Sequence, residues 1–271
     1  MEQLVSLALQ EDLGTLGDVT SQALFAHQRD SFSLTAKQEG VLCGGDVCKE
    51  VFRQVDTHIA VDFLFSDGDT LSEGCTAAVL TGNVASILSA ERTALNFLSL
   101  LSGIATNARA YTSKAEGKAV ILDTRKTIPG FRDLAKYAVR CGGAQNHRSG
   151  LYDMVLIKDN HIDAAGGITA AVKRIRSTWA NRFLIEVETR NLEEVKEALT
   201  CNADRIMLDN MDCSQMKQAV ELIGSAAEVE ASGNMTLDRI EAVSQTGVDF
   251  ISVGELTHSV HAFDFSLRRH L

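Results

Sequence analysis

The chain has 271 residues, of which 45% are hydrophobic and 23% charged, and its formal net charge is −10. This length allows one large domain or two modest ones with a substantial core. A basic excess marks proteins that bind nucleic acid or anionic membranes, so the acidic balance argues against both kinds of partner.

The cysteine pattern indicates a reducing compartment. Six cysteines are scattered without a CxxC pair or zinc spacing, at Cys43, Cys48, Cys75, Cys141, Cys201 and Cys213. In a long chain this pattern is typical of cytosolic thiols rather than of a disulfide framework. The opening MEQLVSLALQEDLG has no basic segment, and no apolar run resembles a membrane helix of ~20 residues. We therefore expect a soluble, cytoplasmic protein without a signal peptide.

The N-terminal part predicts an antiparallel α+β domain. Short strands with Gly/Asp turns are expected within residues 31–47 and 58–83. The stretch that follows, residues 87–115, predicts a long helix leading out of this domain. Four of its apolar residues fall on one face: Leu95, Leu98, Leu101 and Ile104.

The second half alternates between strand and helix. Apolar strands start near 183, 204, 227 and 249, with amphipathic helices expected over 191–200, 213–224 and 236–247. Asn191 with Glu194 has the spacing of a capping box, and Gly224 and Gly247 suit helix C-termini. Earlier strands at 119–124 and 154–158 bring the series to six βα units, which predicts a parallel sheet.

A doubly wound sheet and a (β/α) barrel both fit this alternation. Almost every predicted strand ends in a polar residue or glycine: Arg125 and Lys126, Lys158, Glu188, Asp209, Ser232 and Gly254. In a barrel all strand ends meet at one mouth, whereas in an open sheet only those at the switch point meet. We favour the barrel, in an incomplete or irregular form.

Basic residues gather in one segment of the acidic chain. Residues 125–158 hold seven Lys/Arg and two acids, a local excess of five positive charges. A single strand-end cation is usually a solvated surface charge, but four lie at or near the same predicted edge: Arg125, Lys126, Arg148 and Lys158. Arginine grips carboxylate or phosphate with two hydrogen bonds, and lysine supplies a point charge. The pattern favours a small polyanionic ligand.

Other residues are ambiguous alone. His147 in CGGAQNHRSG reads either as a turn residue or as a donor beside Arg148, and His161 in LIKDNH is more often structural. Glu188 and Asp209 either pair with nearby lysines or form a hard oxygen site for Mg²⁺. The strand-end residues Ser232, Gly233 and Gly254 suit either ordinary turns or a phosphate site of backbone N–H groups. No nucleophile–base pair stands out, so orientation and charge stabilisation would carry any catalysis.

Together these motifs resemble the quinolinate phosphoribosyltransferase family (carboxylating nicotinate-nucleotide pyrophosphorylase). The resemblance runs through ERTALNFLSLLSGIAT, LDTRKTIPGFRDLAKYAVRCGGAQNHRSGLYDMVLIKDNHI, IEVE, LDN and SVGELTHS, in family order along the whole chain. It implies an N-terminal α+β sandwich domain over 1–105, rejoined by about 262–271, and an irregular open (β/α) barrel over 106–261. It also implies at least a homodimer, in which each barrel mouth faces the partner's N-terminal domain.

The implied reaction is the Mg²⁺-dependent joining of quinolinate to 5-phosphoribosyl-1-pyrophosphate in NAD biosynthesis, giving nicotinate mononucleotide, CO₂ and pyrophosphate. Position by position, the resemblance implies quinolinate contacts from Arg125, His147, Arg148 and, from the neighbouring subunit, Arg92. It places Lys126 and Lys158 between quinolinate and the phosphoribosyl group, and Glu188 and Asp209 at the ribose and at Mg²⁺, partly through substrate and water. We count these two lysines and two acids as catalytic. Ser232, Gly233 and Gly254 are the implied 5′-phosphate site, and His161 is counted among the substrate-binding residues.

Two alternatives are weaker. A nicotinate-type phosphoribosyltransferase needs fewer cations for its single carboxylate than this chain provides. A non-catalytic phosphosugar-binding barrel predicts loss of a lysine or an acid from the catalytic set, yet all four are present. Glu255, beside Gly254, departs from the family pattern by adding an acid near the implied phosphate site.

Overall fold

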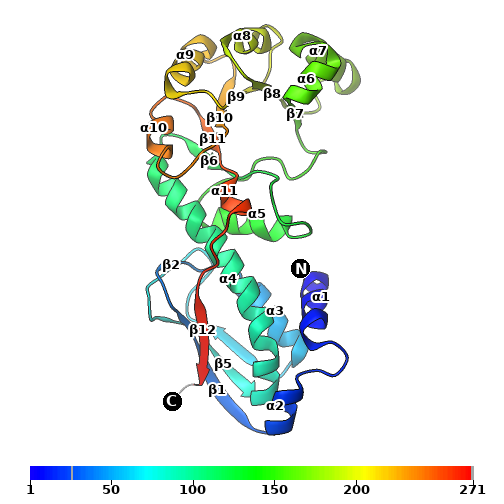
Figure 1. Cartoon of the computed structure of the whole chain (residues 1–271), viewed down its shortest axis with the longest axis vertical. Coiled ribbons are helices and arrows are strands. Elements are labelled where there is room, and N and C mark those ends of the chain that lie inside the picture. Colours follow the sequence, from blue (N-terminus) through cyan, green and yellow to red (C-terminus); the bar gives the residue numbers. More distant parts are fainter. Residues whose placement is uncertain (26, 270–271) are drawn as a thin grey trace. The chain divides into compact units, whose positions relative to one another are not determined.

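The computed structural model describes residues 1–25 and 27–269 and divides the chain into two compact units (Figure 1). Unit 1 comprises Met1–Asn107, Arg140–Gly143 and Val260–Leu271, and unit 2 comprises Ala108–Val139 and Ala144–Ser259. None of the helices within the described residues has the length and apolar character needed to cross a membrane.

Unit 1 is the predicted α+β unit with an antiparallel sheet. The sheet order is β12-β1-β5-β3, and the strands are β1 (Arg29–Ala36), β3 (Ala60–Phe63), β5 (Thr76–Asn83) and β12 (Phe265–Arg269). Alternate residues of β1 are buried (Phe32, Leu34 and Ala36), as expected for a sheet with one face on the core. A small ribbon pairs β2 (Gly40–Val41) with β4 (Thr70–Leu71). The helices are α1 (Glu2–Leu13), α2 (Val19–Leu24), α3 (Gly45–Val55) and the first part of α4 (Val84–Ala115).

The predicted long helix is present as α4. It begins three residues earlier than the sequence indicated and ends at the predicted residue. The four apolar residues expected on one face, Leu95, Leu98, Leu101 and Ile104, are all buried. Their spacing was therefore a sufficient signal for the helix, but burial is not confined to that side, because every residue from 101 to 105 is buried.

Unit 2 is an open, all-parallel barrel-like sheet. Its strands are β6 (Val120–Leu122), β7 (Val155–Ile157), β8 (Ile185–Thr189), β9 (Arg205–Asp209), β10 (Glu228–Ser232) and β11 (Phe250–Ser252). The order β6-β11-β10-β9-β8-β7 places each strand from β7 onward beside its successor and returns the first strand to the last. This is the cyclic strand order of a barrel whose sheet is open between β6 and β7. In a doubly wound sheet, the strand order would instead reverse at a switch point within the sheet. The predicted irregular barrel with six strands is confirmed.

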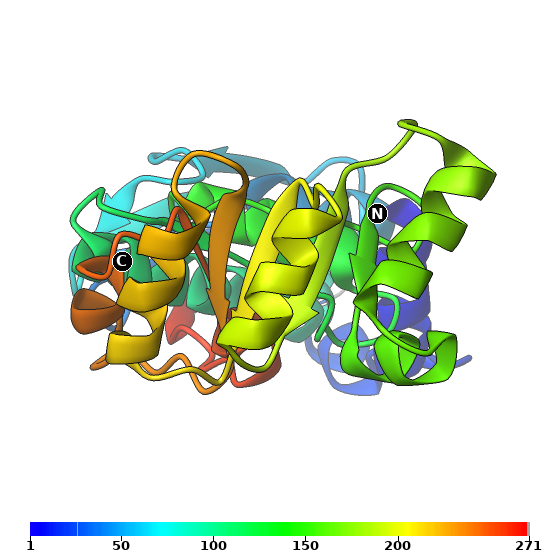
Figure 2. The same ribbon diagram turned by 90° about the horizontal axis from the view of Figure 1, so that it is seen from above.

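Helices follow the strands: α5 (Arg132–Cys141), α6 (Asp159–Ala165), α7 (Ile168–Trp179), α8 (Leu192–Thr200), α9 (Cys213–Ile223), α10 (Ile240–Ser244) and α11 (Glu255–His258). Of these, α7, α8 and α9 lie along the outer side of the sheet (Figures 1 and 2). This alternation leaves the C-terminal ends of all six strands at one edge of the sheet.

Local signals at the helix ends were only partly right. Asn191 caps α8 by accepting the N–H groups of Glu193 and Glu194, as predicted. The Glu194 carboxylate, however, accepts the N–H of Arg190 rather than that of Asn191, so the capping box is not formed.

Of the two glycines predicted to end helices, one does so and the other does not. Gly224 ends α9, as expected. Gly247 does not end α10, which stops at Ser244 because the hydroxyls of Ser244 and Thr246 donate back to helix carbonyls and the chain turns early.

Candidate active site

The strand-end residues of unit 2 lie along the same edge of its sheet. Ile157 pairs with Val187, Glu188 with Met207, and Ser232 with Asp209 in the parallel registers. Lys158, Glu188, Asp209 and Ser232 therefore come from four adjacent strands at one edge. This is the convergence that the barrel interpretation required.

Lys158 and Glu188 form an ion pair at this edge. The Lys158 ammonium lies 3.3 Å from Glu188 Oε2, with the lysine half-exposed and the glutamate nearly buried. His161 Nδ1 accepts the backbone N–H of Lys158 at 3.0 Å, which fixes the turn into α6. Glu188 thus pairs with a lysine, as one of the two sequence interpretations proposed. Its position beside Asp209 on the next strand also keeps a hard oxygen site available.

The turn after β9 packs tightly against the turn after β10. Asn210 donates through Nδ2 to Asp209 Oδ2 at 2.7 Å and through its backbone N–H to Ser232 O at 2.9 Å. Gly233 has φ +91°, and a Cβ there would lie 2.9 Å from the Asn210 backbone nitrogen. A side chain at position 233 is excluded both by the positive φ and by the nearby Asn210 atoms. Only glycine therefore allows the two turns to pack this closely, and it leaves its own backbone groups uncovered by a side chain.

Gly254 lies close to Lys126 at the end of β11. A Cβ on Gly254 would be 3.4 Å from Lys126 Cδ, and the Thr257 hydroxyl donates to the Lys126 carbonyl at 2.8 Å. The added acid Glu255 accepts the Tyr111 hydroxyl at 2.5 Å. Burial and this hydrogen bond raise the pKa of Tyr111.

Arg125 and Arg148 are two partly buried cations under mutual repulsion. Burial, followed by the charge of Arg125, lowers the pKa of Arg148. The Arg148 Nη1 donates to the Met154 carbonyl at 3.3 Å. The Nε of Arg125 is buried and has no hydrogen-bond partner among the residues that the structure describes. An unsatisfied buried donor whose charge is felt by a second guanidinium is an arrangement that an anionic ligand would complete.

A buried clamp holds the loop before Arg148. Lys136 Nζ lies 2.5 Å from Asp123 Oδ1 and donates to the His147 carbonyl at 2.8 Å. Asp123 accepts the His147 N–H at 2.8 Å and the Asn146 side-chain amide at 2.7 Å. Burial raises the pKa of Asp123, and the hydrogen bond from Lys136 opposes that rise.

The sequence did not reveal a second buried cluster, formed by His147, Glu186, Glu230, Arg205 and Ser252. His147 Nε2 lies 2.9 Å from Glu186 Oε2 and 3.4 Å from Glu230 Oε2; the imidazole is 6% exposed and both glutamates are 0% exposed. Arg205 lies 3.3 Å from Glu230, which also accepts the Ser252 hydroxyl at 2.5 Å. The IEVE pattern was the one sequence signal that could have pointed to Glu186. Side chains alternate between the two faces of a strand, so Glu186 lies on the same side of β8 as the predicted site residue Glu188.

The charges of this cluster are coupled. Burial lowers the pKa of His147, but the hydrogen bonds and charges of Glu186 and Glu230 outweigh it and raise the pKa to about 9. Burial and the Glu230 charge raise the pKa of Glu186 to about 7. His147 Nδ1 lies 2.8 Å from the Arg148 backbone nitrogen and accepts its N–H. The protons that the cluster binds are therefore shared among His147 Nε2 and the carboxylates of Glu186 and Glu230. His147, Glu186 and Glu230 offer ligand atoms within 4.8 Å of one another, but Arg205 already neutralises Glu230.

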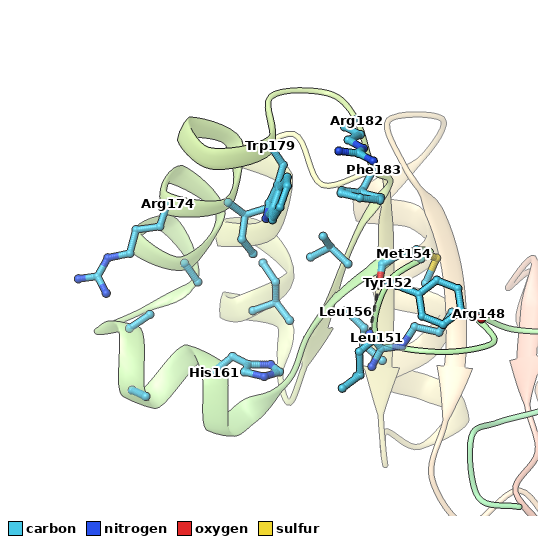
Figure 3. A pocket seen from close by; sticks show the side chains of 16 residues that line it. Arg148, Leu151, Tyr152, Met154, Leu156, His161, Arg174, Trp179, Arg182 and Phe183 are labelled. Carbon is cyan, nitrogen blue, oxygen red and sulfur yellow. Dashed lines mark hydrogen bonds between the residues drawn. The ribbon is translucent and has the colours of Figure 1, made fainter. Parts of the chain in front are cut away.

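An apolar cavity of about 850 Å³ lies between β7 and the helices α6 and α7 (Figure 3). Trp179 and Phe183 lie on one side of it, and Leu151 and Tyr152 on another. Arg148 and His161 are the two predicted site residues among its lining. Its mainly apolar walls differ in chemistry from the charged strand-end edge, which is the better match for polyanions.

The predicted site residues do not all belong to one unit. Arg92 lies in unit 1, on the exposed side of α4. All the others belong to unit 2: Arg125, Lys126, His147, Arg148, Lys158, His161, Glu188, Asp209, Ser232, Gly233 and Gly254.

Comparisons with known proteins agree across the chain. The family model described as "Quinolinate phosphoribosyl transferase, N-terminal domain" matches residues 18–102, and its C-terminal counterpart matches residues 104–268. A chloroplastic nicotinate-nucleotide pyrophosphorylase [carboxylating] of Arabidopsis thaliana is 44% identical over 99% of this chain and 82% of its own. A probable enzyme of the same name from Bacillus subtilis is 42% identical over 98% of this chain and 92% of its own.

A solved structure of a related enzyme has the same fold over nearly the whole chain. The nicotinate-nucleotide pyrophosphorylase from Francisella tularensis superimposes with a TM-score of 0.95 at 44% identity, covering 99% of this chain and 95% of that one. With both family models matched and identity above 40% over nearly full length, the chain belongs to the quinolinate phosphoribosyltransferase family.

Proposed function

We propose that this chain transfers the phosphoribosyl group of 5-phosphoribosyl-1-pyrophosphate to quinolinate and releases pyrophosphate and CO₂, giving nicotinate mononucleotide. The observation that carries the proposal is the Arg125–Arg148 pair, with its buried unsatisfied guanidinium nitrogen, in the unit that also presents Lys158, Glu188 and Asp209. Quinolinate has two adjacent carboxylates, so it supplies the negative charge that two close guanidinium groups lack.

The chemistry requires charge handling rather than a general base. The pyridine nitrogen of quinolinate carries a lone pair that can attack the anomeric carbon as pyrophosphate leaves. Lys126 and Lys158 supply positive charge to the oxygens of the departing group, and the Glu188 and Asp209 carboxylates stabilise positive charge that develops on the ribose. Once the ring nitrogen is quaternised, the neighbouring carboxylate leaves as CO₂, because the electron pair it leaves behind lies next to a positive charge. The ring carbon then takes up a proton from water, which gives nicotinate mononucleotide.

Glu188 and Asp209 also fit a magnesium site. They are carboxylates at the ends of adjacent strands, and Mg²⁺ commonly takes one or two carboxylates together with substrate phosphate and water. Bound there, Mg²⁺ would supply further positive charge to the pyrophosphate. Ser232, Gly233 and Gly254 would bind the 5′-phosphate, and the close packing that requires glycine at 233 keeps backbone groups accessible.

The working assembly in this proposal is a homodimer or a larger oligomer. Arg92 would enter the quinolinate site of the neighbouring subunit, which is consistent with its exposed position on α4. We also propose a cytoplasmic location, supported by free thiols at Cys48, Cys75, Cys201 and Cys213.

The direct test is release of both CO₂ and pyrophosphate when purified protein receives quinolinate, 5-phosphoribosyl-1-pyrophosphate and MgCl₂. Both products should form in equal amounts, and omission of quinolinate should abolish both. Pyrophosphate release with nicotinate in place of quinolinate, and none with quinolinate, would refute the proposal in favour of a nicotinate-type enzyme.

A further inference from the structure

His147 has every polar group engaged inside unit 2. Its backbone N–H donates to Asp123 Oδ1 at 2.8 Å, and its carbonyl accepts from Lys136 Nζ at 2.8 Å. Its Nδ1 accepts the Arg148 N–H at 2.8 Å, and its Nε2 lies 2.9 Å from Glu186 Oε2. A residue bonded in this way is held in one position and orientation.

The two glutamates that bond to the imidazole are carried by strands of the sheet. Glu186 Oε1 is buried without a hydrogen-bond partner among the described residues, whereas Glu230 has further partners. Glu186 on β8 and Glu230 on β10 have no exposed side-chain surface, and β9 runs between their strands. Arg205 of β9 lies 3.3 Å from Glu230, and Ser252 of β11 donates to the same carboxylate at 2.5 Å. Four strands of the barrel thus support one histidine ring.

Arg148 is the next residue in the chain, and it depends on this histidine. Its backbone N–H is bonded to the ring that the glutamates hold, so the ring sets where the Arg148 backbone lies. Among the described residues, its guanidinium group is hydrogen-bonded at a longer distance, 3.3 Å to the Met154 carbonyl. A small displacement of the backbone would therefore move the guanidinium, and misplacement of a substrate-binding group weakens binding steeply.

We propose that Glu186 and Glu230 are positioning residues that act through His147 to hold Arg148 in place for quinolinate. The inference rests on the proposed function and deepens it. It assigns a role in quinolinate affinity to two buried acids that cannot touch the substrate themselves. It also makes support of Arg148 the main contribution of the His147 ring, because both ring nitrogens are engaged within the protein.

The test compares Glu186→Gln and Glu230→Gln with a matched control, Glu228→Gln. Glu228 lies on the same strand as Glu230 and also pairs with Arg205, at 2.8 Å, but its side chain is half-exposed. We expect each buried substitution to raise the quinolinate KM about tenfold or more, with the KM for 5-phosphoribosyl-1-pyrophosphate and kcat within about twofold of wild type. Glu228→Gln should match wild type in all three constants.

A double-mutant cycle decides whether the effect passes through Arg148. In an Arg148→Ala background, Glu186→Gln should add less than about twofold to the quinolinate KM, because the group that it positions is already absent. If the two effects multiply fully, or if Glu186→Gln alone leaves the quinolinate KM unchanged, the proposal is overturned. An equal loss of affinity for both substrates would also overturn it, since that indicates general damage to the fold.

Two safeguards keep the result interpretable. Ser252→Ala removes a hydroxyl donor to Glu230 without leaving a buried charge, so it provides a milder variant if the glutamine variants do not fold; it should raise the quinolinate KM in the same selective way. An unchanged quinolinate KM in a folded Ser252→Ala protein would overturn the proposal. Wild-type protein that fails to turn over quinolinate in parallel refutes the proposed function instead, so the two failures are distinguishable.

Discussion

Lys136 Nζ lies 2.5 Å from Asp123 Oδ1, and both side chains are almost fully buried in unit 2. The same lysine donates to the His147 carbonyl, and the same aspartate accepts the His147 N–H. Breaking a buried pair leaves one charge without compensation. This ion pair therefore connects the stability of the barrel to the position of the loop that carries Arg148.

We predict that Lys136→Met lowers the free energy of unfolding by about 3–5 kcal/mol, because Asp123 is left charged and buried. Urea unfolding followed by circular dichroism measures it. The control is Lys118→Met, which breaks an exposed pair with Glu116 and should cost at most about 1 kcal/mol. Equal losses in the two variants would contradict a buried, structurally important pair.

Arg148→Ala should act chiefly on quinolinate. Loss of a charged hydrogen bond to a buried carboxylate costs about 2–5 kcal/mol, so we expect the quinolinate KM to rise by roughly 30-fold or more. Steady-state kinetics with each substrate varied in turn measures the effect. Arg174→Ala is the control, because Arg174 also lines the apolar cavity but lies away from the strand ends. A comparable loss in Arg174→Ala would move the quinolinate site into that cavity.

The sequence predicted the edge of the sheet better than the interior of the barrel. Strand-end residues such as Glu188 and Asp209 follow from a regular 21–23-residue period, and parallel strands place their ends together regardless of detail. The buried cluster required knowledge of long-range packing. Glu186 meets a histidine 39 residues earlier in the chain, and no local pattern identifies such a partner.

The misassigned helix ends have a related cause. Several groups near a helix terminus compete for the same backbone donors and acceptors, and the differences in energy are small. Glu194 is drawn to Arg190, with which it forms both a backbone bond and a side-chain ion pair at 2.8 Å. The three-residue spacing of Asn191 and Glu194 in the sequence gives no indication that Arg190 competes for the Glu194 carboxylate.

Glu188→Gln tests the proposed metal and ribose role. Loss of this carboxylate should lower kcat by about 10²–10³-fold, the usual effect of removing one electrostatic contact to a transition state. The unfolding midpoint should change little, because its partner Lys158 is half-exposed. Initial rates over a MgCl₂ series measure the change, and Glu193→Gln, an exposed substitution on α8, is the control. Wild-type rates at every Mg²⁺ concentration would remove Glu188 from the catalytic set.

The His147 cluster predicts a pH dependence of stability. The pKa of His147 is raised from 6.5 to about 9, and that of Glu186 from 4.5 to about 7. Because His147 Nδ1 accepts the Arg148 N–H, the proton taken up is shared between Nε2 and the carboxylates, and the folded cluster binds it more tightly than the unfolded chain does. A group with a raised pKa stabilises the fold fully below its unfolded value and loses that contribution as the pH rises through its folded value. The free energy of unfolding should therefore fall between pH 6.5 and 9, by at least ~1 kcal/mol.

Urea titrations at several pH values measure this dependence. His147→Asn lacks the Nε2 position, so its unfolding free energy should vary less over the same range. A wild-type curve that is flat or rises between pH 6.5 and 9 would show that the cluster takes up no proton on folding.

Mixing two inactive variants tests the proposed shared site. Arg92 belongs to unit 1 and Lys126 to unit 2, and in the proposed homodimer each active site would take its Arg92 from one subunit and its Lys126 from the other. Arg92→Ala and Lys126→Ala proteins should each be nearly inactive alone. After subunit exchange, half of the dimers are mixed and each contains one intact site, so activity should recover to roughly a quarter of wild type. Exchange is verified by mass spectrometry of differently tagged subunits. If mixed dimers form and remain inactive, both residues serve the same site from one chain, and the shared-site arrangement is wrong.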